Sequence, residues 1–249
     1  MSSASALSIA TIIIYVLLLN PILYALYRHH RYGILAFLPL SSFCVLKIVA
    51  SIIQLRAEAT NSSMTNALLL NNIGLSPLLI GALGLLHESR TARNPLLRKK
   101  LEWFLVINFH GAVVAGLALV IAGVAGEEGS DPTAADSTLR KAGLLVVLAC
   151  WFVLVAWTAV AYLRPQFDVN APAYADGTKI LFGVTAAIPF IGLRELYATL
   201  TTFLTSTAFG NSLAAKVVLS VVPEMIAVTI FAAIGISTLH IAQKIRTKF

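Results

Sequence analysis

Ile188-Pro189-Phe190-Ile191-Gly192-Leu193-Arg194-Glu195-Leu196-Tyr197 is the stretch that decides how this chain folds. It lies inside an apolar run over residues 179–206, which is long enough to cross a bilayer as a helix. A charged side chain within a membrane helix costs at least about 2.5–3.5 kcal/mol. Arg194 and Glu195 are adjacent, so on a helix their side chains diverge by about 100° and cannot simply satisfy each other. Other helices must therefore supply partners.

The composition is that of a polytopic membrane protein. Of the 249 residues, 58% are hydrophobic and 12% charged, and the mean hydropathy is +0.86, which excludes an ordinary soluble domain. The net charge of +7 comes from basic residues in short loops between apolar runs, so it carries topology information and does not indicate nucleic-acid binding. Cys44 and Cys150 lie in apolar segments, which leaves no disulfide framework and no CxxC metal site.

Seven segments are long and apolar enough to span a bilayer, and together they form one domain over residues 1–249. We predict an all-α, seven-transmembrane-helix bundle with spans at 5–27, 33–55, 64–86, 101–125, 142–163, 179–206 and 215–242. The first segment has no basic residues before it, so it is predicted to be a retained helix and not a cleaved signal peptide.

The basic residues orient the bundle. With the N-terminus lumenal and the C-terminus cytosolic, twelve Lys and Arg residues face the cytosol and four face the lumen. We therefore expect a multi-pass protein of the endoplasmic reticulum. The glycosylation sequon Asn61-Ser62-Ser63 then falls on the lumenal side.

Polar residues from four predicted helices fall at one depth, at roughly 12–17 Å from the lumenal ends for a rise of about 1.5 Å per residue. Two cations and two anions make this layer neutral overall. The layer is either a set of interhelical staples or a functional site, and ionisable groups inside a membrane favour the site. Its members are Lys47, Asn71, Asn72, Arg194, Glu195 and Glu224.

Polar residues elsewhere are given structural roles. His110 is a lone histidine in an apolar helix, which is more often hydrogen-bonded within the structure than a base. The pair His29-His30 is placed in a loop, and no ligand spacing for a metal is present, so neither a metal nor a cofactor is expected. Glu88 and Glu102 flank the basic segment 90–100 and are expected to pair with it at the surface.

Several stretches resemble a family of fungal seven-helix integral membrane proteins classified as a domain of unknown function. The stretches are 43–49 (FCVLKIV), 72–79 (NIGLSPLL), 189–197 (PFIGLRELY) and 223–226 (PEMI), so they extend over the whole bundle. This chain departs from the family pattern at Lys47, where the family has arginine, and lysine loses the bidentate geometry of a guanidinium.

That group resembles in turn the membrane-bound terpene cyclases of fungal meroterpenoid biosynthesis, including the ascofuranone type. The resemblance implies protonation of a terminal epoxide or alkene on a prenyl chain, cyclisation through carbocations, and then deprotonation or capture. It implies a hydrophobic prenylated substrate that enters from the lipid.

The chemistry can be assigned to residues on that basis. Epoxide opening needs a carboxylic acid that stays protonated near neutral pH, which burial favours. Glu224, beside Pro223, is the first choice for this acid and Glu195 the second, while Arg194 and Lys47 keep the other carboxylate ionised. Further residues are expected to contact the substrate or its cation, the aromatic ones through their faces. They are Asn71, Asn72, His110, Trp151, Trp157, Phe190 and Tyr197.

Two other functions stay open. A lipid or small-molecule transporter would carry an inverted repeat with broken helices, and a seven-helix receptor would need a coupling surface. A cyclase predicts a closed apolar cavity with Glu224 or Glu195 on its wall, whereas a transporter predicts a path toward both aqueous faces. Staples alone predict that all four charges are paired, with no cavity beside them.

Overall fold

The computed structural model describes residues 3–60, 75–127, 129, 131–204 and 212–246, and this part of the chain is all-helical without strands. Its elements are α1 (Ser3–His29), η1 (His30–Tyr32), α2 (Ile34–Thr60), α4 (Leu75–Arg93), α5 (Lys99–Glu127), α6 (Ala134–Val160), η2 (Arg164–Gln166), α7 (Tyr174–Phe203), α9 (Leu213–Lys216), η3 (Val217–Val221), α10 (Val222–Ser237) and α11 (Ile241–Arg246).

Among the residues that the structure describes, six helical stretches are long and apolar enough to cross a membrane, which indicates a multi-pass membrane protein. They are Ser5–Tyr32, Ile34–Thr60, Lys99–Glu127, Ala134–Val160, Tyr174–Phe203 and Leu213–Ser237. The predicted third span, 64–86, falls partly on residues 61–74, outside the described part, and α4 is what the structure describes of it. Asn71, Asn72 and the sequon at Asn61 also lie outside the described residues.

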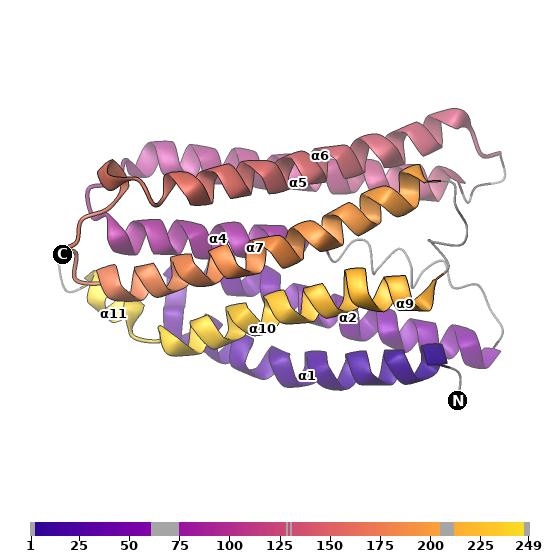
Figure 1. Cartoon of the computed structure of the whole chain (residues 1–249), viewed down its shortest axis with the longest axis horizontal. Coiled ribbons are helices and arrows are strands. Elements are labelled where there is room, and N and C mark those ends of the chain that lie inside the picture. The colour runs from indigo at the N-terminus through magenta and orange to yellow at the C-terminus, as the bar shows by residue number, and fades with distance from the viewer. Residues whose placement is uncertain (1–2, 61–74, 128, 130, 205–211, 247–249) are drawn as a thin grey trace.

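The helices run roughly parallel and stack in three layers (Figure 1). The hairpin of α5 and α6 forms one layer, α4 and α7 the middle one, and α1, α2 and α10 the third. Helix α7 packs against α4, α6 and α10. Of the residues in its most apolar 18-residue stretch, 61% are buried. Residues 188–197, with Arg194 and Glu195, therefore lie in the middle layer of the bundle.

Two glycines allow neighbouring helices to approach α7 closely. A Cβ atom on Gly192 would lie 2.3 Å from Cζ2 of Trp151 on α6, and one on Gly183 would lie 1.4 Å from Cδ1 of Ile234 on α10. These glycines are small-residue contact points of the kind that membrane helices use to pack closely. They allow α7 to lie close to α6 and to α10.

Helix α10 begins with a widened turn. Residues Val217–Val221 form a π-helix, in which the Val222 N–H donates to the Val217 carbonyl. Pro223 has no N–H to donate, and its ring would clash with the carbonyl four residues earlier, so the preceding turn opens. Glu224 follows this proline directly and points into the bundle, with a relative exposure of 1%.

The last two turns of α4 differ from the prediction. The predicted third span ended at residue 86, where the charges begin, but α4 continues to Arg93. The expectation that Glu88 and Glu102 pair at the surface is wrong in its location, because both are buried, with 1% and 3% exposure. His29, predicted to lie in a loop, is the last residue of α1 and is fully buried. In each case a neighbouring helix supplies a polar partner that a hydropathy profile does not contain.

Candidate functional site

Three of the four charged residues predicted at one depth meet in the bundle interior. Glu224 on α10 lies between two cations: its Oε2 is 2.6 Å from Lys47 Nζ on α2, and its Oε1 is 2.6 Å from Arg194 Nε on α7. All three side chains are at most 4% exposed. We call Lys47, Arg194 and Glu224 the buried triad. It joins three helices and places two positive charges on one carboxylate.

Glu195 is next to the triad along the chain but points elsewhere. It is fully buried, and neither of its carboxyl oxygens has a hydrogen-bond partner within the described part of the chain. Arg194 and Glu224 lie within electrostatic range of it, and so does the buried thiol of Cys150 on α6. Arg194 contacts Glu224 on α10, and adjacent helical side chains diverge, so Glu195 does not share this contact.

Two aromatic residues that the sequence analysis did not select lie beside the triad. Tyr15 on α1 is fully buried and packs edge-on against Phe43 of α2, with ring centroids 5.6 Å apart. Lys47 Nζ lies 5.4 Å from the centre of the Phe43 ring. The Tyr15 hydroxyl has no hydrogen-bond partner among the residues described. Because α1 is apolar on all sides, its sequence does not indicate that Tyr15 faces the interior of the bundle.

The predicted aromatic contacts are divided between several places. Trp151 packs on Gly192, one turn before Glu195, and its Nε1 donates to the Ile188 carbonyl at 3.1 Å. Tyr197 is buried, lies within electrostatic range of Arg194 and is 9% exposed, and Phe190 packs partly buried against the core. Trp157 lies elsewhere, with its ring 5.9 Å from the Arg90 guanidinium.

His110 interacts with its own helix. Its Nδ1 lies 2.8 Å from the Val106 carbonyl, one turn earlier in α5, and the side chain is half-buried. This contact is the hydrogen-bonded structural role that a lone histidine in an apolar helix usually has. It does not connect His110 to the triad.

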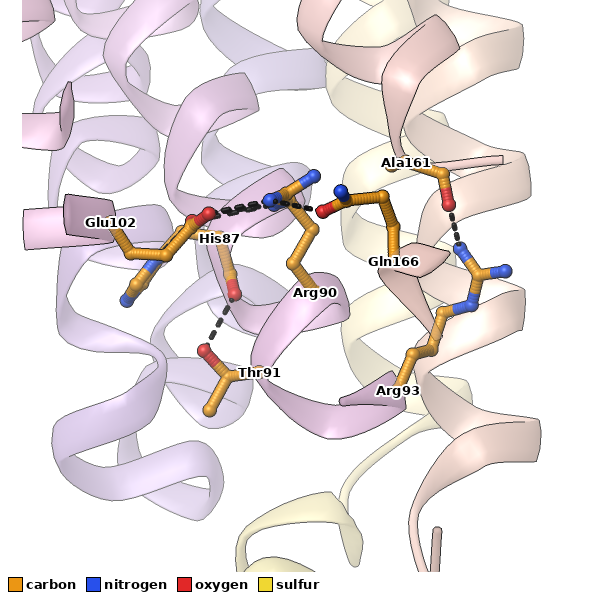
Figure 2. A network of polar contacts seen from close by, with 7 residues as sticks. All are labelled: His87, Arg90, Thr91, Arg93, Glu102, Ala161 and Gln166. Atoms are coloured by element: carbon orange, nitrogen blue, oxygen red, sulfur yellow. Dashed lines mark hydrogen bonds and ion pairs between the residues drawn. The ribbon is translucent and has the colours of Figure 1, made fainter. Parts of the chain in front are cut away.

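A second cluster of buried charges lies at the C-terminal end of α4 (Figure 2). Arg90 donates from Nη2 to Glu102 Oε1 on α5 at 2.5 Å and from Nε to both carboxylate oxygens at 3.2 and 3.3 Å. The same Nη2 donates to Gln166 in η2 at 3.0 Å, and Arg93 Nη1 donates to the Ala161 carbonyl at 2.8 Å. Cations near a helix C-terminus are favourable, and here they also hold the segment between α6 and α7 onto α4.

His29 and Glu88 form a buried pair beside this cluster. The Nδ1 atom of His29 is 2.7 Å from Glu88 Oε1, and its Nε2 is 3.0 Å from the Gly235 carbonyl oxygen. A carbonyl can only accept, so Nε2 carries a hydrogen. The pair then shares one further proton between Nδ1 and Oε1, and it is neutral overall whichever atom holds that proton.

A cavity of about 480 Å³ lies at this end of the bundle. Glu88 and Glu102 are on its wall, and the triad and Glu195 are not. The cavity that a cyclase would need beside Glu195 or Glu224 is thus not this one. Sequence reasoning missed the site because it treated the charges of 87–102 as a solvated loop. The alternation of His87, Glu88, Arg90 and Arg93 directly after an apolar run was the available signal.

The helices and the buried charges define a multi-pass, all-helical membrane protein. Residues 1–241 match the family described as Domain of unknown function (DUF7702), and the chain belongs to this family. Comparison with curated proteins and with solved structures gave no match.

Proposed function

We propose that this protein is a membrane-embedded terpene cyclase, in which Glu195 protonates a terminal epoxide or alkene on the prenyl chain of a hydrophobic substrate. The observation that supports this function is the carboxyl group of Glu195. It is completely buried, yet both oxygens lack a hydrogen-bond partner among the described residues. A structural staple would be paired, whereas a proton donor must leave its oxygen open to substrate.

The geometry favours Glu195 over Glu224 as the acid, the reverse of the order expected from the sequence. Glu224 holds two cations at 2.6 Å, and such contacts stabilise the carboxylate and occupy both of its oxygens. Protonating Glu224 would remove the carboxylate that Lys47 and Arg194 share, at a cost typical of a broken buried ion pair. Glu224 is therefore assigned a positioning role: it holds Arg194 and fixes the start of α10.

The environment of Glu195 combines complete burial with a neighbouring positive charge. Burial without a partner favours the neutral acid, because an isolated carboxylate in a low-dielectric interior is very unstable. The Arg194 guanidinium, on the neighbouring residue of α7, opposes this effect. A group that gives a proton and takes one back in each cycle needs this balance.

The proposed reaction is an isomerisation and needs no cofactor. The Glu195 O–H bond breaks as its proton bonds to the epoxide oxygen. The bond between this oxygen and the more substituted epoxide carbon then breaks, which leaves the electron pair on oxygen and a cation on that carbon. The cation then forms a bond with the electron pair of a neighbouring alkene. The last cation loses a proton from an adjacent carbon to the Glu195 carboxylate, which restores the acid.

Aromatic side chains near Glu195 and near the buried triad would stabilise the carbocation of the substrate. Trp151 packs on Gly192, one helical turn before Glu195 and on the same face of α7. Tyr15 and Phe43 lie on the other side, against the triad. Attraction between a cation and an aromatic face is worth about 2 kcal/mol or more when water is absent.

The topology proposed with this function is a seven-helix bundle with a lumenal N-terminus and a cytosolic C-terminus in the endoplasmic reticulum. The start of α1 and helix α11 lie at opposite ends of the bundle (Figure 1), which supports an odd number of crossings. The segments 90–100 and 164–179 and helix α11 carry the basic residues and lie together at one end, as the positive-inside rule requires for the cytosolic face.

The test is product formation in microsomes that contain the full chain, with prenylated aromatic epoxides as substrates. Glu195→Gln keeps the shape of the side chain and removes the acid, and general acid catalysis contributes about 10²–10⁴-fold to rates. We therefore expect a loss of at least about 100-fold in cyclised product at an unchanged protein level. The control is Glu127→Gln, which changes a partly exposed carboxylate paired with Arg140 and should keep full activity.

Retention of cyclisation by Glu195→Gln would remove Glu195 from the mechanism. If the unaltered protein instead moves the intact epoxide across the membrane of sealed vesicles and forms no product, the protein is a transporter and the cyclase proposal fails.

A further inference from the structure

The cavity at the basic end of the bundle has an apolar wall and a polar end. Most of its lining is apolar, including Leu35, Ala92, Leu97, Trp103 and Ile245. Its volume of about 480 Å³ lies within the range of about 300–1,000 Å³ that small-molecule sites have in proteins. Trp103 and Ile34 on its wall are each 47% exposed, so the cavity opens to the outside of the bundle.

Two residues on the cavity wall have a buried polar atom without a hydrogen bond in the described part of the chain, His87 at Nδ1 and Glu88 at Oε2; His87 Nδ1 lies 3.6 Å from Glu102 Oε2. Only 1% of Glu88 is exposed, and its Oε1 is engaged by His29 at 2.7 Å. Its Oε2 has no hydrogen-bond partner in the described part of the chain. An unsatisfied buried acceptor costs about 1–3 kcal/mol, so the site lacks a hydrogen-bond donor at this point.

The charge of the surroundings decides which kind of donor fits. The His29–Glu88 pair is already neutral, so a ligand ammonium group would place an uncompensated positive charge within a mostly apolar wall. Arg31, Lys99 and Lys244 line the cavity together with Glu88 and Glu102, but an anionic oxygen has no hydrogen to donate to Glu88 Oε2. A neutral hydroxyl group donates one hydrogen bond and adds no charge.

We propose that this cavity binds a lipophilic alcohol or phenol, with the hydroxyl group donating to Glu88 Oε2 and the apolar body lying against Leu97 and Trp103. The proposal goes beyond the cyclase function and does not depend on it. Ala173 on the cavity wall is the N-cap residue of α7, and Glu195 lies 22 residues further along the chain in the same helix, which separates the two sites by roughly 30 Å.

The experiment measures binding to the purified full chain in nanodiscs of defined phospholipid. The probes are dehydroergosterol, a farnesylated phenol and hexadecanol, each compared with its own methyl ether. An ether oxygen has no hydrogen to donate, so at least one alcohol should bind about tenfold more tightly than its ether. In Glu88→Gln that preference should shrink, because a neutral amide oxygen accepts a weaker bond than a carboxylate.

Two tryptophan variants in the same loop locate the site. Leu97 lines the cavity, whereas Leu96 beside it is 89% exposed and does not. Leu97→Trp fills the cavity without altering a helix and should weaken binding of the alcohol at least about tenfold, and Leu96→Trp should leave it unchanged. The proposal is overturned if no alcohol binds, if the ethers bind as tightly as the alcohols, or if Leu97→Trp binds like Leu96→Trp.

Discussion

Glu224→Gln should destabilise the protein far more than the same change at Glu195. Glu224 is 1% exposed and holds Lys47 and Arg194 at 2.6 Å each, so the amide would leave two buried cations without their carboxylate. Removing one partner of a buried ion pair costs about 3–5 kcal/mol. In a chain of this size each kcal/mol lowers the melting temperature by about 2–4 °C, which gives a decrease of roughly 6–20 °C.

The assay is thermal unfolding of the purified full chain in detergent, followed by protein fluorescence. Glu195→Gln loses no hydrogen bond that the structure describes and should melt within about 2 °C of the unaltered protein, or above it. Glu127→Gln, at a partly exposed pair, should change stability by less than about 1 kcal/mol. Adding Lys47→Met to Glu224→Gln removes one stranded cation and should recover part of the loss.

The result that would refute this reasoning is equal destabilisation by Glu195→Gln and Glu224→Gln. It would mean that Glu195 is the counterion of the triad and stays ionised, so it would not be a proton donor. A Glu224→Gln variant that melts like the unaltered protein would be equally damaging, because it would show that the triad is not paired as described.

Three further predictions concern packing and topology. Gly84→Ala should lower the melting temperature, because its Cβ would lie 2.3 Å from the Leu35 carbonyl oxygen on the backbone of α2. The control is Gly111→Ala, whose Cβ would have nothing within 4 Å and which should be neutral or stabilising by about 0.5–1 kcal/mol. Arg90→Lys should lower it as well, by about 2–4 °C or more in the same assay, because a lysine cannot make the bidentate contact with Glu102. A glycosylation acceptor fused to the N-terminus should be modified in microsomes and one fused to the C-terminus should not; modification at the C-terminal end would reverse the proposed orientation.

The sequence predicted the helical class and the approximate positions of six of its seven spans, because apolar runs of this length have few alternatives in a membrane. It also placed Lys47, Arg194 and Glu224 at one depth, since depth follows from counting residues along each helix. It did not predict that Glu224, with a cation on either side, would be the paired carboxylate. That outcome depends on how α2, α7 and α10 are rotated about their axes, which the hydrophobic pattern of nearly uniform apolar helices does not specify.

The basic end of the bundle shows the same limit more strongly. Hydropathy ends a span where charges begin, so residues 87–93 were predicted to leave the membrane as a loop. They remain helical because each buried charge finds a partner on another element: Glu88 on His29, and Arg90 on Glu102. Those partners are 59 and 12 residues away along the chain, and nothing in a single sequence pairs them.

The two charge clusters share a feature that stapling alone does not explain. In each cluster one carboxylate forms ion pairs: Glu224 with Lys47 and Arg194, and Glu102 with Arg90. These contacts are enough to join the helices. Beside each lies a second buried carboxyl group: Glu195, neither of whose oxygens has a partner in the described part of the structure, or Glu88, whose Oε2 has none. A bundle selected for stability alone gains nothing from such acceptors, since each costs about 1–3 kcal/mol and a well-packed apolar side chain would remove the cost. Stability given up at a buried group is the usual sign of a site that binds or reacts, so these two carboxyl groups, more than the ion pairs, are where the function should be sought.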